Sequence, residues 1–204
     1  MLKVKIAVLV SGGGTNLQAL IDAQKNGIIK SGEIDAVISS NPDAYALTRA
    51  KKADIETFVV PRKGNSRKEF ESKIIDILEA KQTELIILAG FMTILSPDFI
   101  EKYRNRIINV HPSLIPSFCG EGYYGIRVHE EALRYGVKVT GATVHYVNEI
   151  PDGGEIILQK PVYISKKDTP ETLQKKVMRT AEWKILPRAA ELVSKKIIKE
   201  RKTK

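Results

Sequence analysis

The chain has 204 residues, of which 43% are hydrophobic and 28% charged, so it is long enough to form one domain with its own buried core. A single cysteine excludes an intrachain disulfide and fits a reducing compartment, and no apolar run is long enough to span a membrane. The net charge of +9 would suit a nucleic-acid-binding protein, but positions 194–204 alone carry +5 of it, which we interpret as a solvated basic tail.

The first predicted elements are a buried strand over residues 4–10 and a helix that begins near Leu17, joined by the glycine-rich turn Ser11–Asn16. This layout aims backbone N–H groups at a phosphate, and we expect Thr15 or Asn16 to cap the helix. The turn matches neither G-x-G-x-x-G nor a P-loop, which disfavours a dinucleotide site. The alternative is a turn that only reverses the chain direction.

Strands and helices then alternate as far as residue 111, which predicts a parallel, doubly wound sheet. The expected strands cover residues 34–39, 57–60, 85–89 and 107–111. The expected helices cover residues 44–53 and 66–81, followed by a short helix that starts at Pro97. Ser66 and Glu69 have the spacing of a capping box.

Asn109 and His111 lie at the end of the fifth strand, just before Pro112. Residues two apart on a strand point to the same face, and open α/β sheets bind ligands at the carboxyl ends of their strands. An amide can donate to a developing oxyanion, and a histidine can carry a proton. The alternative is that both are polar strand-end groups satisfied by neighbouring backbone.

The pattern changes after Pro116. A glycine-rich aromatic loop is followed by a helix over 126–135, two antiparallel strands over 137–147 and 155–164, and a helix over 170–199. We expect the second of these strands to be an edge, because it contains Pro161, and the last helix to kink at Pro187.

Five stretches carry a resemblance to a known family: Ser11-Gly-Gly-Gly-Thr-Asn-Leu-Gln18, Ala89-Gly-Phe-Met92, Asn109-Val-His-Pro-Ser-Leu-Ile-Pro116, Gly141-Ala-Thr-Val-His145 and Asp152-Gly-Gly154. In this order the chain resembles the glycinamide ribonucleotide formyltransferases, folate-dependent enzymes of purine synthesis. The resemblance extends from Ile6 to about Pro187.

The resemblance implies a single α/β domain over 1–204, with a doubly wound, mostly parallel sheet, a Rossmann-like N-terminal half, antiparallel C-terminal strands and a long C-terminal helix. Residues 1–110 would form the ribonucleotide- and phosphate-binding half, residues 111–193 the folate-binding and catalytic half, and residues 194–204 the basic tail. The implied reaction moves the formyl group of 10-formyltetrahydrofolate to the amine of glycinamide ribonucleotide. We expect a cytoplasmic monomer or homodimer that uses these small molecules and no metal, nucleic acid or membrane.

The resemblance also implies roles for individual residues. Asn109 and a protonated His111 would stabilise the oxyanion, while Asp152 would favour the charged form of His111 and carry the proton from the amine to the leaving nitrogen. The implied ribonucleotide contacts are Gly12, Gly13, Gly14, Thr15, Asn16, Arg179 and Glu182. The implied folate contacts are Arg67, Met92, Thr93, Ile94, Leu95, Asn109, Ile150, Pro151 and Gly153. Ser113 and His145 would support the site.

Three features depart from the common family form. Thr93 replaces a frequent arginine, Arg179 stands where some relatives have glutamine, and the loop at 119–127 is unusual, which leaves His129 without an assigned role. We interpret Cys119 as a loop thiol rather than a nucleophile.

Three other functions remain as alternatives. Methionyl-tRNA formyltransferase and formyltetrahydrofolate deformylase each carry an extra domain, for which this chain has no room. A nucleic-acid-binding module would depend on the basic tail, so deleting residues 194–204 would abolish its function but leave most turnover of an enzyme.

Overall fold

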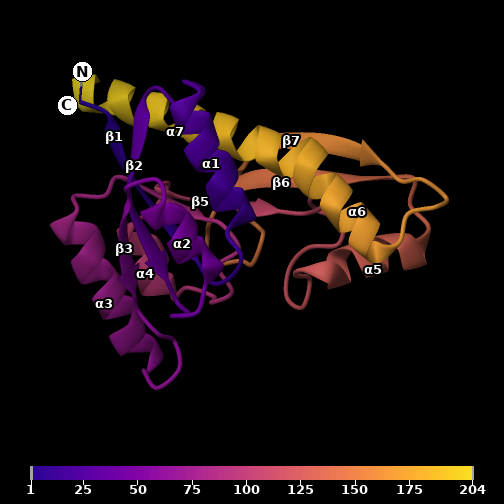
Figure 1. The fold of residues 1–204 in the computed structure, drawn as a ribbon, viewed down its shortest axis with the longest axis horizontal. Coiled ribbons are helices and arrows are strands. Elements are labelled where there is room, and N and C mark those ends of the chain that lie inside the picture. The colour runs from indigo at the N-terminus through magenta and orange to yellow at the C-terminus, as the bar shows by residue number, and fades with distance from the viewer. Residues whose placement is uncertain (1, 204) are drawn as a thin grey trace.

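A seven-stranded sheet lies at the centre of the protein, and the computed structural model describes residues 2–203 (Figure 1). The strands are β1 Val4–Val10, β2 Gly32–Ser39, β3 Glu56–Val59, β4 Leu85–Leu88, β5 Ile107–His111, β6 Val139–Tyr146 and β7 Ile156–Tyr163. The helices are α1 Thr15–Lys25, α2 Tyr45–Lys51, α3 Arg67–Ala80, α4 Pro97–Lys102, α5 Ile126–Tyr135, α6 Pro170–Val177 and α7 Trp183–Thr203, with a π-helical segment, η1 Met178–Glu182, between the last two.

The strand order is β3-β2-β1-β4-β5-β6-β7, and the pairs from β3 to β5 are all parallel. Strand β6 runs antiparallel to β5, and β7 runs antiparallel to β6 at the edge of the sheet. This arrangement confirms the predicted doubly wound sheet, its antiparallel C-terminal strands and the edge position of the strand that contains Pro161.

Apolar side chains on both faces of the parallel strands form two core layers. On one face, Val4, Ile6 and Val8 of β1 pack with side chains of α1, α2 and α7. On the other face, Ala7 and Leu9 pack with side chains of α3 and α4. A strand covered on both faces is a continuous apolar run, which is why β1 is readily recognised in the sequence.

Side-chain caps begin α3, α4 and α6, whereas α1 begins through backbone geometry. The predicted capping box of Ser66 and Glu69 begins α3, and Thr169 caps α6 with Pro170 in the first turn. The expectation that Thr15 or Asn16 caps α1 is wrong, because Gly14 occupies the N-cap position in a left-handed conformation and no side chain caps the helix. The first N–H groups of α1 are therefore not capped by a side chain.

The C-terminal helix differs from the prediction in two ways. The single helix expected over 170–199 is divided into α6, η1 and α7, and Pro187 is buried inside α7 less than two turns after the π segment. The basic stretch at 194–204 continues α7, which ends at Thr203 rather than near residue 199; Ser194 and Ile197 are buried, while the basic side chains described there are exposed. Within residues 2–203, no helix has both the length and the apolar character needed to cross a membrane.

Candidate active site

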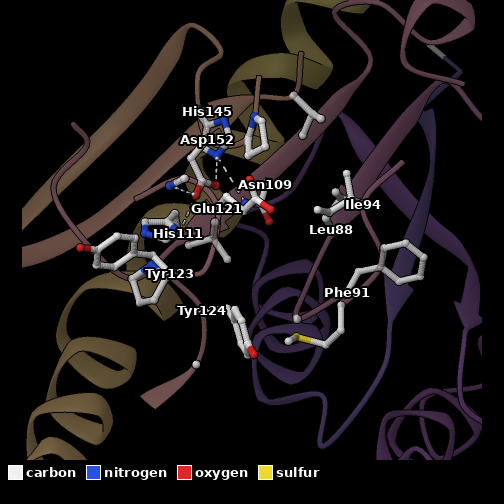
Figure 2. A pocket seen from close by; sticks show the side chains of 18 of the residues that line it. Leu88, Phe91, Ile94, Asn109, His111, Glu121, Tyr123, Tyr124, His145 and Asp152 are labelled. Carbon is white, nitrogen blue, oxygen red and sulfur yellow. Dashed lines mark hydrogen bonds and ion pairs between the residues drawn. The ribbon is translucent and has the colours of Figure 1, made fainter. Parts of the chain in front are cut away.

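A cavity of about 780 Å³ lies where β4 and β5 end, a size typical of small-molecule sites (Figure 2). Most of its wall comes from four segments: residues 90–95 after β4, residues 109–112 at the end of β5, the loop at 120–125 and the loop at 147–152. Single residues from other elements complete it, among them Asn16, His129 and Glu182. Figure 2 shows polar side chains gathered at one end of the cavity and Leu88, Phe91 and Ile94 across from them.

Asn109 and His111 both line the cavity because β5 extends beyond β4, whose last residue, Leu88, pairs with Asn109. The amide Nδ2 of Asn109 lies 3.3 Å from Nε2 of His145, and Nδ1 of His145 lies 2.8 Å from the carbonyl oxygen of Tyr146. The Tyr146 carbonyl accepts a hydrogen bond from the N–H at Nδ1, so Nε2 can accept from Asn109 whenever it carries no proton of its own. One N–H of the Asn109 amide thus remains for a ligand.

Asp152 reaches the same cluster from the loop between β6 and β7 (Figure 2). Its Oδ2 lies 3.3 Å from Nδ1 of His111 and accepts a hydrogen bond of 2.9 Å from the N–H of Gly120, and its Oδ1 lies 3.5 Å from Nε2 of His145. The loop starts beside the beginning of β5, because β6 is antiparallel, and returns to place Asp152 against the end of β5. Asn109 and His111 thus lie at the end of their own strand, whereas Asp152 reaches them through a loop.

The second ring nitrogen of His111, Nε2, lies 2.8 Å from the carbonyl oxygen of Phe118. Both ring nitrogens therefore face acceptors, and both contacts are filled only when the ring carries two protons. Burial nevertheless lowers the pKa of His111, although Asp152 and the Phe118 carbonyl raise it. Asp152 thus favours the charged form of His111, as expected, but the cost of burying the charge is larger and decides the direction of the shift in pKa.

The carboxyl group of Asp152 remains ionised at neutral pH. Burial raises its pKa, but the His145 ring, the nearby His111 and the N–H of Gly120 together lower it below the ordinary value for aspartate. Asp152 is thus a partly buried carboxylate beside two imidazoles, a group that can accept a proton from a ligand in the cavity.

The residues expected to bind a ribonucleotide are only partly brought together. Nδ2 of Asn16 donates to Oε2 of Glu182 at 2.8 Å, and both residues line the cavity. Burial raises the pKa of Glu182 to about 7, although the bond from Asn16 lowers it. The other turn residues do not line the cavity wall: Gly12, Gly13, Gly14 and Thr15. Arg179 is exposed and also lies outside that wall.

Most residues expected on the folate side do line the cavity: Met92, Thr93, Ile94, Leu95, Ile150 and Pro151. Gly153 and Arg67 do not, but Nη2 of Arg67 donates to the carbonyl oxygen of Ile94 at 2.9 Å. The carboxylate of Glu71 on α3 accepts from the N–H of Ser96 at 2.7 Å, so both side chains fix the segment that follows β4.

Ser11 joins the glycine turn to this apolar wall. Its hydroxyl accepts from the N–H of Met92 at 3.0 Å and is hydrogen-bonded to the hydroxyl of Ser40 at 2.7 Å. The glycine turn and the apolar wall of the cavity are therefore connected through one side chain.

Sequence reasoning assigned no role to several cavity residues: Phe91, Glu121, Tyr123, Tyr124 and His129. The His129 ring is 1% exposed, neither of its nitrogens has a hydrogen-bond partner within residues 2–203, and burial followed by the nearby His111 lowers its pKa to about 4. The available sequence signal was the rarity of histidine: the chain has only three, and all three line this cavity.

The remaining predicted residues support the backbone or lie beside the site. The Ser113 hydroxyl donates to the carbonyl oxygen of Ser117 at 2.5 Å, and the Ser113 carbonyl accepts from Oγ1 of Thr143 at 2.7 Å. Burial and then Asp152 raise the pKa of the Cys119 thiol, which keeps it protonated. Among the described residues, 2–203, no group of three or more His, Cys, Asp or Glu side chains is arranged to hold a metal ion.

Three comparisons connect this geometry to known proteins. The family model described as "Formyl transferase" matches residues 4–190. The chain is 44% identical over 184 residues to the phosphoribosylglycinamide formyltransferase of Haemophilus influenzae, across 90% of this chain and 84% of that protein. The crystal structure of glycinamide ribonucleotide transformylase 1 from Symbiobacterium toebii matches with a TM-score of 0.88 and 37% identity, across 95% of this chain and 89% of that chain.

A longer relative shows the same similarity. The chain is 45% identical over 193 residues to the human trifunctional purine biosynthetic protein adenosine-3, across 94% of this chain. That match spans only 18% of the human protein.

Proposed function

This chain belongs to the formyl transferase family, and from that premise we propose that it transfers the formyl group of 10-formyltetrahydrofolate to the amine of glycinamide ribonucleotide. The observation that carries the proposal is the cluster of Asn109, His111 and Asp152 in a cavity that also contains Asn16 and Glu182. This reaction requires a hydrogen-bond donor to the oxyanion, a group that carries a proton and a binding place for the ribonucleotide.

In the proposed reaction the amine attacks the formyl carbon, the carbonyl oxygen becomes an oxyanion, and tetrahydrofolate leaves. Asn109 would donate the N–H that His145 does not use to this oxyanion. His111 would donate from Nε2, which requires the Phe118 carbonyl to give up its hydrogen bond. A neutral His111 has only one N–H to donate, so the proton on Nε2 decides whether it can act.

We assign the proton transfer to Asp152. The amine must lose a proton after attack, and the leaving folate nitrogen must gain one. A carboxylate that is ionised at neutral pH and held in place by the N–H of Gly120 is suited to accept the first proton and return it to the leaving group. Neither step needs a covalent enzyme intermediate.

The two substrates would occupy opposite parts of the cavity. We place the phosphate at the start of α1, where the N–H groups have no side-chain cap, and the ribose beside Asn16 and Glu182. The folate rings would lie against the apolar wall at 91–95 and 150–151. The assignment of residues 1–110 and 111–193 to these two halves, with the enzyme acting as a cytoplasmic monomer or homodimer, is part of this proposal.

The test is formyl transfer by the purified protein supplied with 10-formyltetrahydrofolate and glycinamide ribonucleotide, with the formylated ribonucleotide measured directly. Methionyl-tRNA and buffer alone replace the ribonucleotide in two controls. We expect product only with the ribonucleotide. Formate release that does not depend on the ribonucleotide would indicate a deformylase. Formylation of the tRNA would indicate a methionyl-tRNA formyltransferase.

A further inference from the structure

The carbonyl groups of the glycine turn are tied to α2, which lies beside α1 (Figure 1). The N–H of Ala46 donates to the carbonyl oxygen of Gly12 at 3.1 Å, and Nε of Arg49 donates to the carbonyl oxygen of Gly13 at 2.8 Å. Both carbonyls thus take their hydrogen bonds from α2. Backbone amides whose carbonyls are held on one side present their N–H groups away from it.

Arg49 is itself held in place on several sides. Its Nη1 donates to Oε1 of Gln18 on α1 at 3.2 Å, and its guanidinium lies 5.0 Å from the ring centre of Tyr45. A bond from a charged guanidinium is stronger than one between neutral groups, and the planar group has few ways to satisfy the same partners. The side chain therefore connects α2, the turn and α1.

The turn has little freedom to change its shape around this contact. Gly14 adopts a φ of +71°, and a Cβ placed on it would lie 2.6 Å from Cβ of Ala46 and 3.4 Å from Cδ of Arg49. The close packing requires glycine at this position. The positive charge of Arg49 consequently stands next to the N-terminus of α1, where the helix dipole already favours an anion.

A second cavity of about 460 Å³ lies on this side of the turn. Arg49 and Thr15 line it together with Trp183, the single tryptophan of the chain, and with Arg188. Because Trp183 and Arg49 line one cavity, the tryptophan fluorescence can report on the turn without any assay of activity.

We propose that Arg49 is a positioning residue for the phosphate-binding turn. It holds the Gly13 carbonyl toward α2, keeps the N–H groups at the start of α1 directed at the substrate phosphate, and adds a positive charge beside them. The proposal rests on the proposed function and extends it to a residue outside the cavity that holds the cluster of Asn109, His111 and Asp152.

The test compares Arg49→Met, which removes the charge and the hydrogen bonds, with Arg49→Lys, which keeps the charge but not the planar guanidinium that bonds Gly13 and Gln18 together. Arg188→Met is the matched control, because Arg188 lines the same cavity but makes no hydrogen bond to the turn within residues 2–203. For each variant the KM of both substrates, kcat and Tm are measured. The quenching of Trp183 by ribose 5-phosphate is titrated in parallel.

We expect Arg49→Met to raise the KM for the ribonucleotide about tenfold or more, as loss of a charge-assisted contact does, with the folate KM and kcat within about twofold. Arg49→Lys should fall between this variant and the parent, and Arg188→Met should match the parent. The ribose 5-phosphate titration should weaken in the same order.

An unchanged ribonucleotide KM in Arg49→Met would overturn the proposal, as would equal rises in both KM values with a lower Tm, which indicate a purely structural role. Failure of the proposed function looks different, because the parent protein itself would then form no formylated ribonucleotide. The fluorescence titration still tests Arg49 in that case, since weakened sugar-phosphate binding supports its role and unchanged binding refutes it.

Discussion

At the scale of single residues, His111 has acceptors at both ring nitrogens, yet burial lowers its pKa. The second proton on the ring, which would complete both hydrogen bonds, is therefore held weakly. Asp152 stays charged beside it, so the pair can take up one further proton and pass it to a substrate. This arrangement suits a group that must gain and release a proton within one reaction cycle.

The first prediction concerns this pair. His111→Ala and Asp152→Asn should each lower kcat by about 10²-fold or more, and the double variant should lose much less than the product of the two losses, because residues that act as a unit are not additive. Turnover is measured with both substrates saturating, and Tm confirms folding. Losses that simply multiply would show that the two residues act independently.

The second prediction concerns His129, whose pKa of about 4 in the folded protein lies below the ordinary value of 6.5. The unfolded chain binds a proton between these values and the folded chain does not, so the stability that this residue contributes above pH 6.5 is lost as the pH falls toward 4. The full difference corresponds to about 3 kcal/mol. His129→Leu should remove this loss, as measured by urea unfolding at pH 7, 5.5 and 4.5.

The comparison must be made between variant and parent at each pH. Glu182, with a pKa raised to about 7, acts in the opposite direction, because its stabilising contribution is present at low pH and lost as the pH rises from 4.5 to 7. Its effect is common to both proteins and cancels. Parallel pH profiles in the two proteins would rule out the assigned titration of His129.

At the scale of elements, the segment between β4 and α4 has no regular structure but is fixed from α3. Glu71 is buried, accepts from the N–H of Ser96 and pairs with Nε of Arg67 at 3.5 Å, while Arg67 holds the Ile94 carbonyl. Two residues one turn apart on a helix thus shape the apolar wall of the cavity.

The third prediction follows from this anchor. Glu71→Ala leaves the Ser96 N–H unpaired, which should cost about 1–3 kcal/mol of stability and raise the folate KM several-fold more than the ribonucleotide KM. Glu79→Ala is the control, because Glu79 lies on the same helix in an exposed pair with Lys102. Calorimetry and steady-state kinetics check both effects. If the Tm falls and neither KM changes, the wall is held by its other contacts.

The elements that are easiest to predict have a local sequence pattern. Strand β1 is a buried apolar run, and the start of α3 is a capping box of residues three apart. The left-handed Gly14 cap and the π segment at 178–182 depend on tertiary packing, so no local pattern predicts them. The Phe118 carbonyl is a backbone group that every residue type has, and nothing in the sequence could place it against His111.

The candidate site, like the fold, was predictable where local sequence patterns determine it. The motifs place Asn109 and His111 together because a strand alternates with a period of two, and the structure brings Asp152 to them. The positions that were unclear, such as Arg179 and His129, lie on helices whose orientation is set by long-range packing. Arg179 is exposed, whereas His129 is buried in the wall of the cavity.

At the scale of the whole molecule, the last turns of α7 fasten the beginning of the sheet. Arg201 donates to the carbonyl oxygen of Leu2 at 2.9 Å and to Oε1 of Glu84 at 2.8 Å, and Figure 1 shows the end of α7 beside the start of β1. Deleting residues 194–204 would also remove the buried Ile197, so such a deletion tests stability rather than nucleic-acid binding.

The fourth prediction uses a milder change. Arg201→Met should lower the free energy of unfolding by about 1–2 kcal/mol, because the side chain is partly buried and binds a carboxylate, and should lower Tm by a few degrees. Both KM values should stay within about twofold of the parent. Lys202→Met, on the neighbouring exposed residue, is the control. A Tm equal to that of the parent would mean that the contact adds nothing to stability.

The hydroxyl of Ser11, which joins the glycine turn to Met92, has a thermodynamic consequence. In the proposed arrangement, a phosphate that orders the turn also orders the wall assigned to the second substrate, so each substrate should bind more tightly when the other is present. Linkage requires the two enhancement factors to be equal. Ser11→Ala, which breaks the connection but keeps both binding surfaces, should bring that shared cooperativity toward one while leaving each substrate's affinity for the empty protein nearly unchanged.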